Sequence, residues 1–262
     1  MEKQSENTTE VAKLLHTARV NKQSITQLSK QDIVLNRTQA YDVQEQGLKL
    51  REQAGEKRIG LKMGLTSEGK RKQMNLDSPL FGELTNKMQI ENAKTFNMSS
   101  QIHPKIEPEV AFLFHKPLKG EVTREQVLEA TSSVCACLEI LDSRYEQFKY
   151  FSMEDVIADN SSSSHFILGP WLSDFKNLDL KNLNMKMSIN NEVVQSGLSS
   201  EISGDPVVSI IEQCRLLALR GRQIEAGTFV LAGAATAAVA LEPGMHVSLT
   251  VDHLPKCEVH IS

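Results

Sequence analysis

The spacing of hydrophobic residues predicts a helix near the start of the chain. Within residues 10–20, Val11, Leu14 and Leu15 fall on one side of a helix, as in an amphipathic segment. Residues 1–9 are polar throughout, and we expect them to be frayed.

A second helix is predicted over residues 38–53, where Gly55 follows as a stop signal. Residues 57–64 alternate between polar and apolar side chains, which indicates a strand. Thr66 is placed to cap a short helix that runs to about residue 74. The first part of the chain is therefore predicted to be rich in helices.

Short apolar runs separated by turn residues follow, and they predict strands at 81–84, 106–114, 134–141, 228–232, 246–251 and 257–261. Two helices interrupt this series. One covers 123–130, where Thr123 and Gln126 have the spacing of a capping box. The other is capped by Asp205, has Pro206 at its first position and stops at Gly221.

Many short strands with few helices favour a closed or strongly curled β structure. The predicted class is α+β, a highly curled mixed β structure with surrounding helices. We expect a small helix-rich section over residues 1–75 and a larger β domain over residues 76–262.

Composition narrows the possible functions. Apolar residues make up 40% of the 262 residues and charged residues 24%, which is ordinary for a globular protein. The formal charge of −4 gives no general attraction to nucleic acid or to an anionic membrane, so neither is an expected partner. No apolar run is long enough to span a membrane, and the polar start lacks the core of a signal peptide, which predicts a cytoplasmic location. The four cysteines have no metal-ligand or redox spacing and are expected to be buried.

Two acids stand inside a strongly apolar segment at Glu107-Pro108-Glu109. Residues two apart on a strand point to the same face, so both carboxylates would enter one space. Carboxylates that close repel each other, and their burial is costly unless a cation lies between them. A hard divalent ion such as Mg²⁺ or Mn²⁺ suits such ligands. The alternative is an exposed edge strand with two solvated glutamates.

Glu139 is the single charged residue in the apolar stretch 134–141. It is either a third carboxylate ligand or a buried acid paired with a base such as Arg144. Three carboxylates leave positions open on an octahedral ion, where a bidentate substrate can chelate.

Two further segments are candidates for the site. Residues 159–164 form a polar turn that either faces a ligand or is an ordinary surface loop. In the segment 60–64, glycines flank Lys62, and they permit the close approach of a ligand or of another chain. Lys62 is a candidate for holding a substrate carboxylate or moving a proton, although a lone lysine on a strand is usually solvated.

From about Lys57 onward, the chain resembles the 2-keto-4-pentenoate hydratase / 4-oxalocrotonate decarboxylase family of the fumarylacetoacetate hydrolase superfamily. The segments that carry the resemblance are GLKMGLTSE (60–68), SPLFGEL (78–84), IHPKIEPEVAF (102–112), LEILDSRYEQFKY (138–150), ADNSSSSHFILG (158–169) and AGTFVLAGAATAAVALEPG (226–244). The resemblance implies a curled β catalytic domain that assembles into homo-oligomers. One departure is Ser161, where relatives usually have alanine.

The resemblance also implies functional residues. The Mg²⁺ or Mn²⁺ ligands are expected to be Glu107, Glu109 and Glu139. Lys62 and Glu109 are the expected catalytic residues. The expected substrate-binding residues are Lys62, Asp159, Asn160, Ser162 and Ser163.

The implied reaction is the decarboxylation of 4-oxalocrotonate (2-oxo-3-hexenedioate), a small 2-keto dicarboxylic acid formed when aromatic compounds are degraded by meta-cleavage. Leu80 favours this reaction over hydration, because hydratases tend to carry an acid just before the Phe-Gly pair, here Phe81-Gly82. An acid there would serve water activation, whereas an apolar residue would exclude water.

Three alternatives stay open. In the first, the chain is a hydratase of 2-hydroxypenta-2,4-dienoate. In the second it is a non-catalytic partner in a complex with a hydratase homologue, and in the third it is a hydrolase of acylpyruvates. The hydrolase usually calls for a His–Glu pair near the N-terminal part of the site, and His16 is the one histidine before His103.

Overall fold

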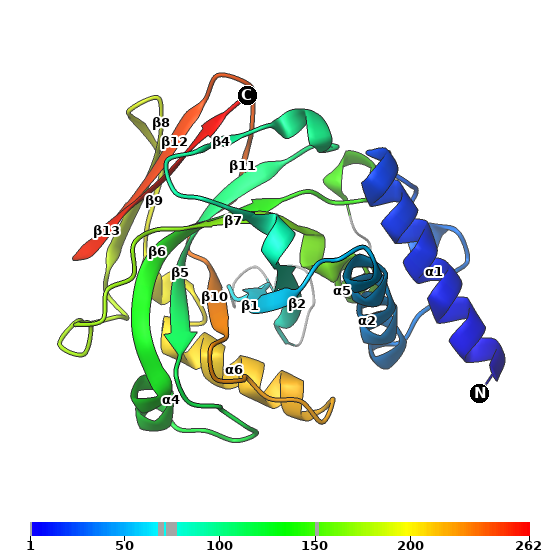
Figure 1. Cartoon of the computed structure of the whole chain (residues 1–262), viewed down its shortest axis with the longest axis horizontal. Helices are drawn as coiled ribbons and strands as arrows, with labels where there is room; N and C mark the ends of the chain where they lie inside the picture. Colours follow the sequence, from blue (N-terminus) through cyan, green and yellow to red (C-terminus); the bar gives the residue numbers. More distant parts are fainter. Residues whose placement is uncertain (1, 68–70, 72–77, 150–151) are drawn as a thin grey trace.

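The computed structural model describes residues 2–67, 71, 78–149 and 152–262. Three helices lie together at one side of the molecule (Figure 1): α1 (Glu2–Asn21), α2 (Arg37–Gln53) and α5 (Met153–Ala158). A capping box between Asn36 and Gln39 starts α2, one residue from the predicted boundary. Helix α5, which the sequence reading missed, has Ser152 as its N-cap.

Helix α1 is longer than predicted, because it begins at Glu2 rather than near residue 10. Its inner side buries Thr8 together with Val11, Ala12 and Leu15. The expectation that residues 1–9 fray is therefore wrong for the backbone described here.

The larger sheet has eight strands: β1 (Arg58–Gly64), β2 (Leu80–Thr85), β3 (Gln89–Ile90), β5 (Lys105–Phe114), β6 (Thr131–Leu141), β7 (Ser163–Leu168), β10 (Phe229–Ala234) and β11 (Val239–Ala240). Their order is β2-β1-β10-β5-β6-β7-β3, with β11 beside β5. Pairs β1–β10 and β3–β7 are parallel and the others antiparallel, so the sheet is mixed. It curls around the centre of the molecule (Figure 1).

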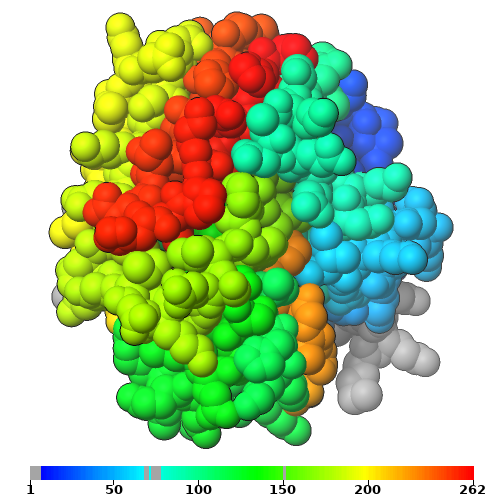
Figure 2. All heavy atoms as spheres, turned by 60° about the vertical axis from the view of Figure 1, so that its left-hand side comes forward, coloured from blue at the N-terminus to red at the C-terminus, as the bar shows by residue number. Residues whose placement is uncertain are grey.

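The smaller sheet has five strands in the order β4-β13-β12-β8-β9. Their bounds are β4 (Thr95–Phe96), β8 (Asn184–Ile189), β9 (Glu192–Leu198), β12 (His246–Val251) and β13 (Leu254–Ile261). The inner side of this sheet packs on β6 through β12 and β13. Its outer side forms part of the surface in Figure 2, where β13 appears in red beside β4 in teal.

Two helices cover the lower end of the larger sheet in Figure 1: α4 (Arg124–Ala130) and α6 (Pro206–Ala218). The predicted caps are confirmed. Thr123 and Gln126 form a capping box, and the Asp205 carboxylate accepts the N–H of Val207 at 2.8 Å. Helix α6 ends three residues before Gly221, which adopts φ +67.

Short 3₁₀ turns connect these elements at Leu28–Lys30, Asn86–Met88, Met98–Ser100, Glu146–Phe148, Asn160–Ser162 and Ser199–Glu201. Among the described residues, no helix has both the length and the apolar character needed to cross a membrane.

The predicted class is confirmed, since helices surround a curled mixed β structure. The helix expected over 66–74 falls mostly outside the described residues. The division at residue 75 stays a prediction, although strand β1, which precedes it, belongs to the larger sheet.

Candidate metal centre

The three acids singled out in the sequence meet where β5 and β6 pair. Glu107 lies directly opposite Glu139 in the antiparallel register, and Glu109 is two residues further on the same face of β5. One carboxylate oxygen from each residue lies within 4.8 Å of the others. Glu109 and Glu139 are fully buried, so the alternative of an exposed edge strand is wrong.

Three carboxylates gather in this cluster, and two of them are fully buried. Burial, and then the charges of Glu139 and Glu107, raise the pKa of Glu109 well above its ordinary value. The Glu109 Oε2 atom accepts the N–H of Gly233 at 2.7 Å. Its Oε1 atom is buried and has no hydrogen-bond partner among the described residues. Such a set of oxygen donors fits a hard divalent cation.

Among the described residues, Lys62 brings a positive charge to this cluster. Its Nζ lies 2.9 Å from Oε2 of Glu139, and its side chain is 2% exposed. Burial alone would lower the pKa of Lys62, but the three carboxylates outweigh burial and raise that pKa above the usual lysine value. Lys62 therefore keeps its proton and can act as a charged donor.

A cavity of about 290 Å³ opens beside the cluster, and Lys62 and Glu107 line it. Lys105 lines it too, with its Nζ 4.4 Å from the centre of the Phe148 ring. We did not single out Lys105 from the sequence. The signal was present, since Lys105 is two residues before Glu107 and shares its strand face.

The turn 159–163 borders the same cavity through Ser161 and Ser162. Residues Asn160, Ser161 and Ser162 have φ values of 50, 55 and 56, in the left-handed region that residues other than glycine rarely adopt. The Ser162 hydroxyl is buried and has no hydrogen-bond partner in the part of the chain described. Ser163 donates its hydroxyl to Glu139 Oε1 at 3.2 Å.

Asp159 is bound inside the protein rather than lining the cavity. Its carboxylate accepts hydrogen bonds from the backbone N–H and the guanidinium of Arg144. Burial raises the pKa of Asp159 to about 6, although Arg144 opposes this shift. The alternative that pairs Arg144 with Glu139 is wrong, because Glu139 pairs with Lys62 and Arg144 with Asp159.

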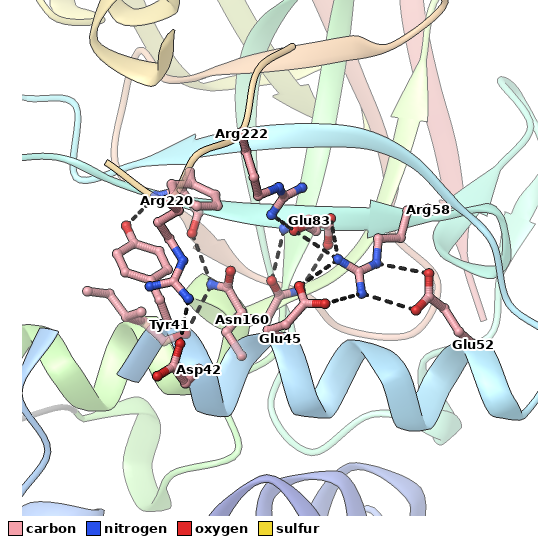
Figure 3. A network of polar contacts seen from close by, with 12 residues as sticks. Tyr41, Asp42, Glu45, Glu52, Arg58, Glu83, Asn160, Arg220 and Arg222 are labelled. Carbon is pink, nitrogen blue, oxygen red and sulfur yellow. Dashed lines mark hydrogen bonds and ion pairs between the residues drawn. The ribbon is translucent and has the colours of Figure 1, made fainter. Parts of the chain in front are cut away.

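The Asn160 side chain joins the turn to strand β2 (Figure 3). Its amide donates to the Glu83 carbonyl and accepts from the Glu83 N–H, both at 2.9 Å. The Glu83 carboxylate is in turn paired with Arg58 and Arg222. Asn160 and Asp159 thus hold the two sides of the turn in place, and their predicted contact with substrate stays a prediction.

Gly64 separates Ser161 from Leu80 at the edge of the cavity. A Cβ atom on Gly64 would lie 2.5 Å from the Ser161 Oγ and 2.9 Å from the Leu80 Cδ1. A larger residue at position 64 would have to displace both side chains, which gives a reason for one of the two glycines that flank Lys62. Leu80 is fully buried, so an apolar group stands next to the turn.

The other candidate residues lie elsewhere. All four cysteines are free and buried, as expected. His16 lies on α1 in a separate cavity that shares no lining residue with the one beside the carboxylates. Within the described ranges, Glu107, Glu109 and Glu139 form the single group of three such side chains placed to hold a metal.

Comparison with known proteins shows which enzymes this chain is similar to. Residues 62–262 match the fumarylacetoacetate (FAA) hydrolase C-terminal family. The chain is 41% identical to a 4-oxalocrotonate decarboxylase from a Pseudomonas species, over 93% of this chain and 94% of that one. It is 34% identical to a 2-hydroxyhexa-2,4-dienoate hydratase from Comamonas testosteroni, over 85% of both.

A solved structure is similar over nearly the whole chain. It is the 4-oxalocrotonate decarboxylase from Pseudomonas putida G7 complexed with magnesium and adipate. Its TM-score is 0.94 at 34% identity, with 98% of both chains covered.

Proposed function

This chain belongs to the fumarylacetoacetate hydrolase family, and from that membership we propose that it catalyses the metal-dependent decarboxylation of 4-oxalocrotonate to 2-hydroxypenta-2,4-dienoate. The observation that carries the proposal is the carboxylate cluster, in which one buried Glu109 oxygen has no partner among the described residues, beside a cavity lined by Lys62 and Lys105. The higher identity to decarboxylases than to hydratases supports this choice of reaction.

The proposed ligands of Mg²⁺ or Mn²⁺ are Glu107, Glu109 and Glu139. Their oxygens are the donors that such ions prefer, and a magnesium-bound relative of the same fold supports the assignment. When bound, the ion supplies Lewis-acid polarisation of the substrate's 2-keto group. The Gly233 N–H donates to one oxygen of Glu109 and so would help to orient this carboxylate as a ligand.

Lys62 is the proposed proton donor. Loss of CO₂ leaves the electron pair of the broken carbon–carbon bond in an extended dienolate, whose oxygen must take a proton to give the enol product. Lys62 lines the cavity, and its ammonium group lies 2.9 Å from Glu139 at the edge of the proposed metal site. Its positive charge also stabilises the negative charge that develops on the dienolate.

Lys105 and Ser162 are the proposed contacts for the ends of the substrate. Lys105 lines the cavity as well as Lys62. Lys62 is committed to the carboxylate cluster, so a dicarboxylate substrate needs a further cation such as Lys105. The Ser162 hydroxyl, which has no partner among the described residues, offers a donor to the substrate. Ser163, Asp159 and Asn160 are proposed to keep this turn in position.

Hydration of 2-hydroxypenta-2,4-dienoate is the second candidate, supported by the similarity to hydratases. Leu80 weighs against it, since this buried apolar side chain stands beside Gly64 and Ser161, where water would need to be activated.

A paired ultraviolet assay separates the two reactions. The purified chain is given 4-oxalocrotonate or 2-hydroxypenta-2,4-dienoate, each with Mg²⁺ and with excess chelator. We expect loss of the diacid with release of CO₂ only when the metal is present. Consumption of the dienoate alone would make the chain a hydratase, and no reaction with either would favour the non-catalytic partner.

The cytoplasmic location, a homo-oligomer and a complex with a hydratase homologue are also part of the proposal. The family resemblance supports the two kinds of assembly. Light scattering on the chain alone, and after mixing with a hydratase relative, measures both masses.

A further inference from the structure

A second polar cavity lies on the other side of the turn 159–163. It has a volume of about 340 Å³ and is bounded by α1, α2 and the start of β7. It shares no lining residue with the cavity beside the carboxylate cluster. The reaction proposed above uses none of the side chains that approach it from α1 and α2.

Positive charge predominates in its lining. Of the described residues, five basic side chains border the cavity, namely Arg19, Lys22, Arg51, Lys87 and Arg144, against two acids, Glu56 and Asp142. Seryl hydroxyls and the His165 ring complete the polar wall. A cavity lined in this way attracts small anions.

The two acids are already occupied by other groups. The Asp142 carboxylate accepts the N–H groups of Ile102 and His103 at 2.9 and 2.8 Å. Glu56 pairs with Arg51 at 2.8 Å and accepts the hydroxyl of Thr85. Glu56 lies 4.0 Å from Arg19, too far for a hydrogen bond. The α1 side of the cavity therefore has positive charge to spare.

The ionisation of neighbouring groups reflects this excess. Burial, followed by the charge of Arg51, lowers the pKa of Arg19 to about 10. Burial, followed by the charges of Arg51 and Arg19, lowers the pKa of His165 to about 4. An anion between these side chains would relieve their mutual repulsion.

We propose that this cavity is a second binding site, for a small oxyanion with two or more negative charges, held by Arg19 and Lys22 beside the Arg51–Glu56 pair. Inorganic phosphate and a short dicarboxylate share this chemistry. Arginine suits both, because its planar fork binds two oxygens at once.

Two contacts connect this site to the carboxylate cluster. Arg144 borders the cavity and binds Asp159 at the start of the left-handed turn. A ligand beside Arg144 can therefore change the position of that turn. Ser163 also borders the cavity, and its hydroxyl binds Glu139. The wall of the cavity is thus one side chain away from a proposed metal ligand.

Calorimetric titration of the magnesium-loaded full chain with inorganic phosphate tests the proposal. We expect one site whose Kd rises about tenfold in Arg19→Gln, because one charged hydrogen-bonding partner is lost. The matched control is Arg215→Gln, which removes an exposed arginine on α6. Its Kd should equal that of the wild type.

Three further arms make the outcome decisive. Lys22→Gln, an exposed change, should also weaken binding and so replaces Arg19→Gln if that variant does not fold. Phosphate should bind Glu109→Gln as tightly as the wild type, whereas loss of binding there would put the anion on the metal and overturn the proposal. Titration of succinate into Glu109→Gln shows which of the two anions the site prefers.

Two further outcomes would overturn the proposal. One is that neither anion binds, and the other is that phosphate binds equally to the wild type and to both cavity variants, Arg19→Gln and Lys22→Gln.

Discussion

Two buried clusters of charge lie on opposite faces of the β1–β2 pair. Lys62 stands opposite Gly82 in the register and Leu61 opposite Glu83, so the side chains of Lys62 and Glu83 point to different faces. On the first face, one lysine meets three carboxylates. On the second, the single carboxylate of Glu83 meets two arginines, Arg58 and Arg222 (Figure 3).

The difference separates a cluster that is complete in itself from the proposed metal site. Each Glu83 oxygen has an arginine partner, and Arg58 binds Glu45 and Glu52 as well, so this network needs nothing from outside. The cluster around Glu109 leaves a buried oxygen without a partner among the described residues. Unpaired buried charge is costly. The cluster around Glu109 therefore indicates a ligand that supplies positive charge.

Neutralising Glu109 should give the largest effect, and on activity. We expect Glu109→Gln to lower kcat for 4-oxalocrotonate by about 10³-fold, because a charged ligand is lost from the group that stabilises the developing charge. The metal-free variant should unfold at an equal or higher temperature than the wild type, since one repelling carboxylate is gone. Steady-state kinetics and thermal unfolding in chelator measure both. The exposed change Glu192→Gln is the control, and full activity in Glu109→Gln would refute the assignment of this ligand.

Neutralising Glu83 should have the opposite effect, lowering stability and leaving kcat almost unchanged. Glu83→Gln leaves Arg58 and Arg222 without their shared partner, and we expect a loss of about 3 kcal/mol in the free energy of unfolding. This value is at the lower end of the range for removing one partner of a buried ion pair, because both arginines are partly exposed. Well below the unfolding temperature kcat should change little, since Asn160 binds the Glu83 backbone rather than its carboxylate. A loss of activity as large as that of Glu109→Gln would remove the distinction between the clusters.

Asn160 links the two clusters, and its replacement should affect both activity and stability. Asn160→Ala removes two hydrogen bonds to Glu83 and puts alanine at a φ of 50, which together should cost about 2 kcal/mol of stability and lower kcat several-fold. Asn160→Gly is the matched variant, because it removes the bonds but tolerates the left-handed backbone. If both variants keep wild-type kcat, the turn is not held in place through Asn160.

The smallest effect concerns the basic cavity, where the charge imbalance has the opposite sign. His165 has a pKa of about 4 in the folded chain and an ordinary value of 6.5 when exposed. Between these values the unfolded chain binds a proton that the folded chain does not, so stability is present above pH 6.5 and falls as the pH drops toward 4. The expected loss from pH 6.5 to 5.5 is about 1 kcal/mol. Denaturant unfolding in phosphate-free buffer should show a smaller loss for His165→Gln, and identical pH profiles would contradict the prediction.

The fold was predictable where hydrophobic spacing or caps are strong. The strand pair that carries Glu107 and Glu139 and the capped helices α4 and α6 are examples. Strand β7 was missed because it starts with two serines, which face Glu139 on one side and Gln101 on the other. Strand β8 was missed although Met185 and Met187 alternate with exposed residues, a signal that a closer reading would have found.

The site was predictable where strand geometry alone decides it. Spacing brings Glu107 and Glu109 to one face, and the same spacing would have added Lys105. The partners of Arg144, Asn160 and Glu83 were not predictable, because these contacts join segments far apart in the chain. The sequence therefore indicates which groups carry the chemistry, and tertiary packing decides which of them are already paired.

Calorimetric titration of metal-free protein with Mn²⁺ tests the central claim most directly. The account predicts one site per chain, weakened at least about 100-fold in Glu107→Gln, Glu109→Gln and Glu139→Gln and unchanged in Glu83→Gln. Equal Mn²⁺ affinity in the wild type and in Glu109→Gln, or no binding to the wild type, would contradict it.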